Sequence, residues 1–140
     1  MTTTHSRSSR TPLTTTTRGA AAVAAALCLV VAVIHVIDQG GIALHDPPYI
    51  GVGYWLLEVV AVVTAVLLVR RPTVPVWVVA LLVGAGPFIG YVVSRSTGLP
   101  GYSDDIGNWG EPLGVLSLVV EAVLVILAAV VLSRLRRRAP

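Results

Sequence analysis

Four long runs of apolar residues alternate with short polar segments along this chain of 140 residues. Each run covers about 20 residues and a helix rises about 1.5 Å per residue, so one run can cross the roughly 30 Å hydrocarbon core of a bilayer. The predicted fold class is therefore all-α, a polytopic membrane protein built as a four-helix bundle. The four predicted spans are residues 18–37, 49–69, 74–94 and 112–132.

The segments outside these runs are polar. Residues 1–17 are rich in Thr and Ser without apolar periodicity, which predicts a disordered tail because such a segment buries too little apolar surface to offset ordering entropy. Gly and Pro punctuate residues 95–111, which predicts an outer loop without a long helix or strand. Residues 134–140 form a basic tail, so that the transmembrane domain covers residues 18–133.

Composition supports a membrane protein over a soluble one. Hydrophobic residues make up 55% of the chain and charged residues only 12%, whereas a soluble domain carries about 25% charged residues. A buried soluble bundle is the alternative that this balance disfavours.

Charge is distributed unevenly between the two ends of the spans. All ten basic residues are arginine, and nine lie at the ends that four alternating helices place on one side: Arg7, Arg10, Arg18, Arg70, Arg71, Arg134, Arg136, Arg137 and Arg138. The other side holds Asp38, Asp46, Asp104, Asp105 and Glu111, together with Arg95. Basic residues concentrate on the cytoplasmic side of membrane proteins, which predicts that both termini are cytoplasmic.

The same distribution bears on partners. The formal net charge of +3 does not indicate nucleic-acid binding, because the arginines lie at the membrane boundaries of the spans. The predicted partners are the lipid bilayer and, at the Arg-rich cytoplasmic ends, anionic lipid head groups. Assembly into a homo-oligomer or a larger membrane complex stays open.

Two carboxylates lie deep inside the predicted spans. By helical rise, Glu58 and Glu121 are about 13 and 14 Å below the outer boundary, and they are separated by 63 residues in a weak internal repeat. Glu58 shares a stripe of small residues on its helix, which predicts that it faces inward and meets Glu121. A charged carboxylate at this depth costs at least about 2.5–3.5 kcal/mol. Because the chain has no Lys, the pair is predicted to be protonated or to bind a positively charged species.

Further polar groups are predicted beside this pair. His35 and Asp38 share one face at the outer end of the first span because they are three residues apart, and Tyr91 and Ser117 are predicted hydrogen-bond partners for a protonated Glu. In the third span, Pro87 leaves the carbonyl of Val83 without its helical donor. Gly86 and Gly90 form a G-x-x-x-G pair, which predicts close helix contact. At the loop, Arg95 is predicted to clamp residues 95–111 through Asp104, Asp105 or Glu111.

No catalytic motif accompanies these residues. The chain lacks a Ser/His/Asp grouping, a C-x-x-C pair and a phosphate loop, so an enzyme is not predicted. A haem would have only His35 and His45 as axial ligands, and a metal held by His35, Asp38 and Glu58 is only weakly indicated by spacing. The cofactor therefore stays unknown, and Cys28 is predicted to be a buried small hydrophobe.

The region from Ser94 to Glu121 resembles a known group of proteins. Its motif is S-R-x-x-G-L-P-G, then D-D, then W-x-E-P-L-G-x-x-S-L-x-x-E. In these residues, about a quarter of the chain, the sequence is similar to short, uncharacterised four-span membrane proteins of high-GC actinobacteria. The resemblance implies a four-span fold in a bacterial plasma membrane, and it implies no activity.

The functional hypothesis is a non-enzymatic plasma-membrane component that binds a proton, cation or small ligand at an outward-opening carboxylate site. One alternative is a small, oligomeric transporter coupled to protons or cations. The other is a membrane redox subunit that binds haem.

Overall fold

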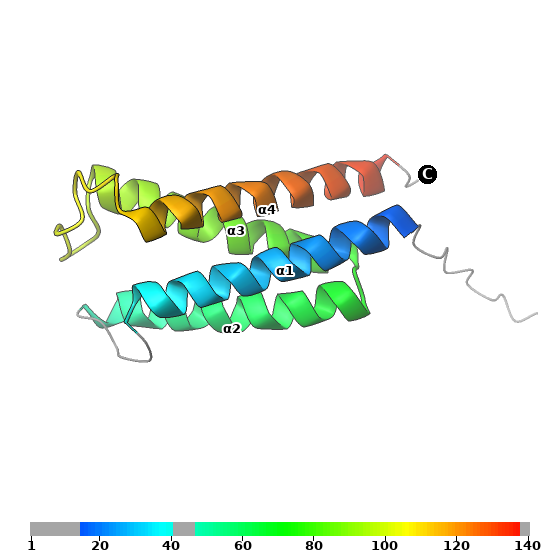
Figure 1. Cartoon of the computed structure of the whole chain (residues 1–140), viewed down its shortest axis with the longest axis horizontal. Coiled ribbons are helices and arrows are strands. Elements are labelled where there is room, and N and C mark those ends of the chain that lie inside the picture. Colours follow the sequence, from blue (N-terminus) through cyan, green and yellow to red (C-terminus); the bar gives the residue numbers. More distant parts are fainter. Residues whose placement is uncertain (1–14, 41–46, 138–140) are drawn as a thin grey trace, which may run out of the picture.

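The computed structural model describes residues 15–40 and 47–137. Within these residues the chain forms the helices α1 (Thr15–Asp38), α2 (Pro48–Arg70), α3 (Val74–Ser96) and α4 (Pro112–Arg136), which run alternately up and down (Figure 1). All four are long and apolar enough to cross a membrane, which confirms the prediction of an all-helical chain with four candidate spans. Residues 1–14 and 138–140 of the predicted tails lie outside the described residues, as do His45 and Asp46.

The helix boundaries follow local signals in the sequence. Pro48 and Pro112 stand in the first turns of α2 and α4, where a missing N–H group costs no helical hydrogen bond. Glu111 caps α4, because its carboxylate accepts hydrogen bonds from the N–H groups of Leu113 (3.0 Å) and Gly114 (2.7 Å). At its other end α4 continues four residues past the predicted boundary, and its arginines there favour the negative end of the helix dipole.

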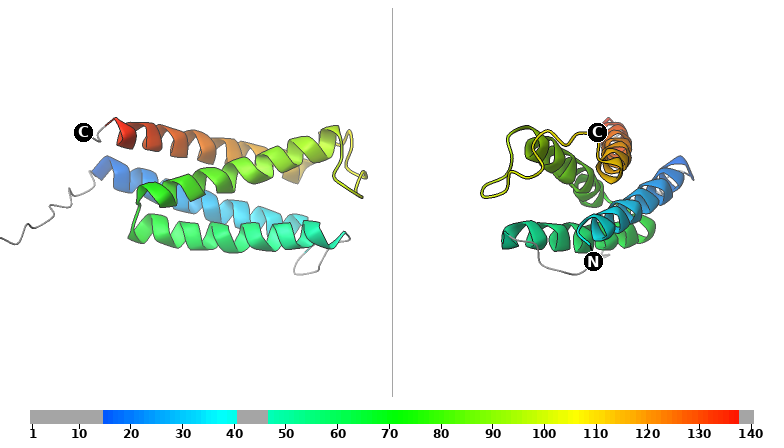
Figure 2. Two further views of the ribbon diagram at one scale, coloured as in Figure 1. Left: turned by 180° about the vertical axis from the view of Figure 1, so that it is seen from behind. Right: turned by 60° about the vertical axis from the view of Figure 1, so that its left-hand side comes forward.

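The bundle consists of two helix pairs. α1 lies along α2 and α4 lies along α3, and the pair of α3 and α4 lies over the other pair (Figure 2). α1 also contacts α4, whereas α2 and α3 meet over a shorter stretch. We call the end that carries residues 97–111 the loop end, and the end at which α2 meets α3 through Arg71 the arginine end.

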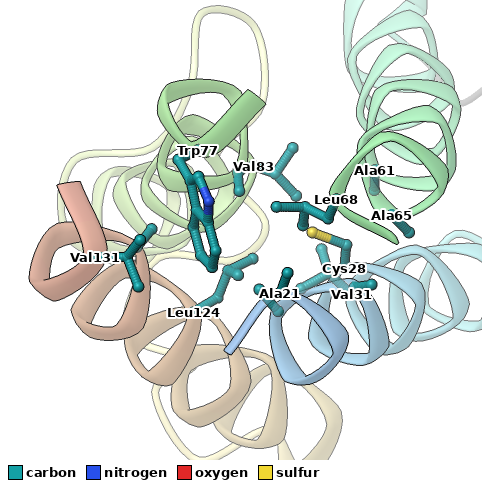
Figure 3. Packing of buried hydrophobic residues seen from close by; sticks show 14 of the residues in the cluster. Ala21, Cys28, Val31, Ala61, Ala65, Leu68, Trp77, Val83, Leu124 and Val131 are labelled. Atoms are coloured by element: carbon teal, nitrogen blue, oxygen red, sulfur yellow. The ribbon is translucent and has the colours of Figure 1, made fainter. Parts of the chain in front are cut away.

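The apolar core fills the bundle from its middle to the arginine end. Leu68, Trp77 and Leu124 are 0% exposed, and the Trp77 ring lies between α3 and α4 beside Leu124 and Val131 (Figure 3). Alanines and Cys28 complete this core and allow the helices to approach closely. The arginine-end half is therefore closed by packed side chains.

The contact between α3 and α4 uses glycines other than those predicted. A Cβ atom added at Gly86 or Gly90 would meet nothing within 4 Å, so the prediction of a G-x-x-x-G helix contact is wrong. A Cβ atom at Gly84 would lie 2.9 Å from the carbonyl oxygen of Glu121. Two residues along a helix are about 200° apart around its axis. Gly84 therefore faces α4 while Gly86 faces the opposite way.

Candidate functional site

A cavity of about 770 Å³ occupies the loop-end half of the bundle. All four helices and the segment between α3 and α4 contribute to its wall. Pockets that bind small molecules have volumes of about 300–1,000 Å³ and combine a mostly apolar lining with a few polar groups. This cavity matches that description, and five of the six residues predicted to form a site line it: His35, Asp38, Tyr91, Ser117 and Glu121.

Glu121 is the deepest charged group of the cavity. It lies on the buried stripe of α4 with Gly114 and Ser117, and it is only 1% exposed. The hydroxyl of Ser117 donates to its Oε1 atom at 2.5 Å. Its Oε2 atom is buried and has no hydrogen-bond partner among the described residues. One oxygen of a residue that lines the cavity is therefore buried without a hydrogen-bond partner.

His35 faces Glu121 from α1. Its Nδ1 atom lies 2.9 Å from the carbonyl oxygen of Val31, and because a carbonyl oxygen only accepts, Nδ1 carries a hydrogen. The Nε2 atom lies 3.7 Å from Oε1 of Glu121. The ring is held on its other side by Tyr54, at a centroid distance of 5.5 Å. A proton shared by the two residues, on Nε2 or on the carboxyl group, would compensate the carboxylate.

Tyrosines form much of the polar wall above this pair. All four tyrosines of the chain, Tyr49, Tyr54, Tyr91 and Tyr102, line the cavity. Tyr54 donates to Oδ2 of Asp38 at 2.7 Å, and Tyr49 donates to the carbonyl of Pro100 at 2.6 Å. Burial, together with the carboxylates of Asp105 and Asp104, raises the pKa of the Tyr102 hydroxyl in the loop, so this group stays neutral.

Arg95 fixes the segment between α3 and α4 over the cavity. Its guanidinium forms an ion pair with Asp105 and lies 3.8 Å from Oε2 of Glu111. Nε donates to the carbonyl of Asn108 at 3.2 Å, and the group lies over the Tyr91 ring, 4.6 Å from its centroid. The predicted clamp thus uses Asp105 and Glu111, whereas Asp104 is exposed.

Glu58 does not line this cavity, so the prediction that it meets Glu121 is wrong. It lies instead in a separate groove on the outside of α1 and α2, beside Val36 and Trp55. Its Oε1 atom accepts a hydrogen bond from Nε2 of Gln39 at 2.7 Å. Tyr54 and Glu58, four residues apart, are about 40° apart around α2. That offset places Tyr54 on the cavity side of α1 and Glu58 on the far side.

The position of Pro87 agrees with the sequence analysis. Pro87 and Val83 both line the cavity, and the nitrogen of Pro87 has no hydrogen to donate to the carbonyl of Val83. α3 nevertheless stays helical through this point. The carbonyl of Val83, a residue of the cavity wall, therefore lacks its usual donor four residues further along the helix.

Three cavity residues were missed as site residues. No site role was predicted for Tyr49, Tyr54 and Tyr102, because aromatic residues near a span boundary are typical of the membrane interface. One feature of the sequence could have identified them as site residues: all the tyrosines of the chain lie near the outer ends of the spans.

Metal and haem ligation gain no support from the positions of the donors. In the part of the chain that the structure describes, no three His, Cys, Asp or Glu side chains are grouped to hold a metal ion. Cys28 is buried in the apolar core, as predicted, and Glu58 lies in a different groove from His35 and Asp38. The second histidine of the haem hypothesis, His45, lies outside the described residues.

A scan against protein-family models, a search of curated proteins and a search of solved structures each found no match to this chain. The resemblance to actinobacterial four-span proteins therefore stays a prediction.

Proposed function

We propose that this chain is a non-enzymatic, multi-pass protein of a bacterial plasma membrane that binds a small, positively charged ligand in the cavity above Glu121. The single observation that carries the proposal is the Oε2 atom of Glu121. It belongs to a carboxyl group that is 1% exposed, lines the cavity and leaves this oxygen without a hydrogen-bond partner in the described residues. Buried polar atoms are nearly always hydrogen-bonded, so an exception in a cavity wall supports a bound ligand.

The charges around the cavity support a cation. Asp38, Asp105, Glu111 and Glu121 line it, and among the described residues Arg95 is its only arginine or lysine. Arg95 is already engaged by Asp105 and Glu111, which leaves Glu121 with His35 and Asp38 with Tyr54. A ligand with positive charge would offset the cost of a carboxylate at this depth.

The size of the cavity favours an organic ligand over a bare ion. A volume of about 770 Å³ is far larger than the roughly 30 Å³ that one water molecule occupies. An inorganic cation would also need several ligands around it, and in the described residues no three His, Cys, Asp or Glu side chains are grouped to supply them. In the absence of ligand, the proton shared by His35 and Glu121 compensates the carboxylate.

The closed core supports a binding protein over a carrier. Alternating access would require a path from Glu121 to the arginine end, and Leu68, Trp77 and Leu124 occupy that half with 0% exposure.

The arginines at the arginine end favour the cytoplasm, so the cavity would open to the outside. Labelling of single cysteines introduced at Ser103 and Ser133 with a membrane-impermeant reagent tests this orientation. Only the cysteine at position 103 should react in intact cells.

The binding function is tested on the purified protein. Thermal unfolding is measured with a panel of organic ammonium compounds, because a ligand that binds only the folded state raises Tm. At least one compound should raise Tm in the natural protein and in Glu58→Gln, and none in Glu121→Gln. Glu58→Gln is the matched control, since it changes a carboxylate of similar depth outside the cavity. An equal shift in all three proteins would overturn the proposal.

A further inference from the structure

The exposed lining residues of α2 and α3 point to a sideways opening of the cavity between these two helices. Leu56 of α2 and Leu82 of α3 both line it, and they are 64% and 58% exposed. By helical rise, Leu56 lies about 12 Å and Leu82 about 21 Å from the loop end of its helix. These depths correspond to the hydrocarbon core of a bilayer rather than to its water boundary. The opening therefore faces lipid chains.

The wall opposite this opening is polar. Glu121 belongs to α4 and His35 to α1, the two helices that contact each other behind the cavity. The apolar lining contributed by α2 and α3 includes Leu57, Val60 and Val79. By helical rise, Val60 lies about 18 Å from the loop end, whereas Glu121 lies about 14 Å from it. The apolar part of the cavity thus extends deeper than its carboxylate.

The tyrosines add a recognition element for a particular kind of cation. Ring faces attract ammonium groups, and aromatic residues around a cavity are a common means of binding alkylated ammonium compounds. Tyr54 and Tyr91 lie on helices on different sides of the cavity, α2 and α3. A hydrophilic ion would need none of this apolar and aromatic lining.

We propose that the ligand is an amphipathic ammonium compound that enters between α2 and α3 from the hydrocarbon core of the bilayer and places its charge at Glu121. Its alkyl part would lie along Leu56 and Leu82. This inference rests on the proposed function and specifies the ligand class and the route. A ligand of this class accounts for three features of the cavity: the side opening, the buried carboxylate and the excess of acidic groups.

Four probes test the ligand class: decylamine, ethylamine, decanol and decanoate, with binding measured by calorimetry in detergent micelles at pH 7. Decylamine is a cation at this pH, as the pKa of about 10.4 for Lys indicates. Its Kd should be at least tenfold lower than those of ethylamine and decanol, because each buried CH₂ group contributes about 0.8 kcal/mol and decanol lacks the charge. Decanoate should bind most weakly of the ten-carbon probes.

The outcomes separate the two proposals. If ethylamine binds as tightly as decylamine and Glu121→Gln abolishes both, the binding function stands and the amphipathic class is overturned. Equal affinity for decanol, or preference for decanoate, overturns the cationic class and with it the proposed function. If no probe binds in a manner that depends on Glu121, the proposed function itself fails.

The side entrance has its own test. Leu82→Trp enlarges a side chain at the opening, and Ile89→Trp is the control because Ile89 is 59% exposed on the same helix without lining the cavity. Association of decylamine, followed by stopped-flow fluorescence in liposomes, should slow at least fivefold in Leu82→Trp and change less than twofold in Ile89→Trp. Equal rates in both variants would overturn the side entrance, and circular dichroism verifies that both are folded.

Discussion

His35 on α1 places its Nε2 atom 3.7 Å from Oε1 of Glu121 on α4, although 86 residues separate them in the chain. The bond from Nδ1 to the carbonyl of Val31 fixes the ring orientation and directs Nε2 at the carboxyl group. A second bond, from Ser117, holds the carboxyl group from its own helix. The pair is therefore positioned from both sides, while Oε2 of Glu121 has no hydrogen-bond partner among the described residues.

Replacing Glu121 with Gln should leave the fold intact. The carboxamide keeps an oxygen that accepts from Ser117 and removes the risk of an uncompensated charge in the membrane. We expect Tm of the ligand-free protein to change by less than about 3 °C, a shift that corresponds to under roughly 1 kcal/mol for a domain of this size. Thermal unfolding in detergent checks this. A fall of 10 °C or more would mean that the carboxylate has a structural partner.

Replacing His35 with Phe should alter proton exchange on ligand binding. In the natural protein an ammonium group at Glu121 removes the need for the shared proton, so binding should release it. Phe fills a similar volume and keeps the ring contact with Tyr54, but it has no Nε2 atom. Calorimetry in two buffers of different ionisation enthalpy gives the number of protons released per decylamine bound. That number should differ between the two proteins, and identical values would show that His35 has no part in it.

The span pattern was sufficient to predict the four helices, because the hydrophobic thickness of a bilayer fixes their length. Predicted and observed starts agree to within one residue for α2, α3 and α4. The observed ends lie a few residues further on, where polar or basic residues continue the last turn. Gly114, Ser117 and Glu121 are spaced three and four residues apart, which places them on one face of α4, and all three are buried.

The sequence did not show which neighbouring helix packs against each helix face. Spacing put Glu58 on a face with small residues, but it does not say on which side of α1 that face lies. The wrong prediction of a helix contact at Gly86 has the same cause. A G-x-x-x-G pair indicates a face without side chains, but it does not show which helix, if any, packs against that face. The neighbour of a face depends on how the four helices are arranged around one another, which spacing within a single helix does not contain.

Replacing Arg95 with Ala should free the segment between α3 and α4. Arg95 contacts Asp105, Asn108 and Glu111 from a side chain that is 10% exposed. Removing one member of a buried ion pair costs about 3–5 kcal/mol, and the partial exposure of Asp105 and Glu111 reduces the expected loss to about 1–3 kcal/mol. Limited chymotrypsin digestion should then cut at Tyr102 or Trp109 at least fivefold faster. Arg71→Ala, an exposed arginine at the other end, is the control, and an unchanged cutting rate in Arg95→Ala would show that the clamp is dispensable.

Replacing Gly84 and Gly86 with Ala should have opposite effects, although the glycines are two residues apart. A Cβ atom at Gly84 would lie 2.9 Å from both the carbonyl oxygen of Glu121 and Cγ2 of Val125. A backbone atom cannot turn aside as a flexible side chain can, so α3 and α4 must separate, at a cost of about 1–3 kcal/mol. A Cβ atom at Gly86 meets open space, and Ala favours the helix by up to about 1 kcal/mol. Thermal unfolding should therefore give a lower Tm for Gly84→Ala and an equal or higher Tm for Gly86→Ala. A loss of stability at position 86 alone would mean that α3 is rotated about its axis, and Gly86, rather than Gly84, would then contact α4.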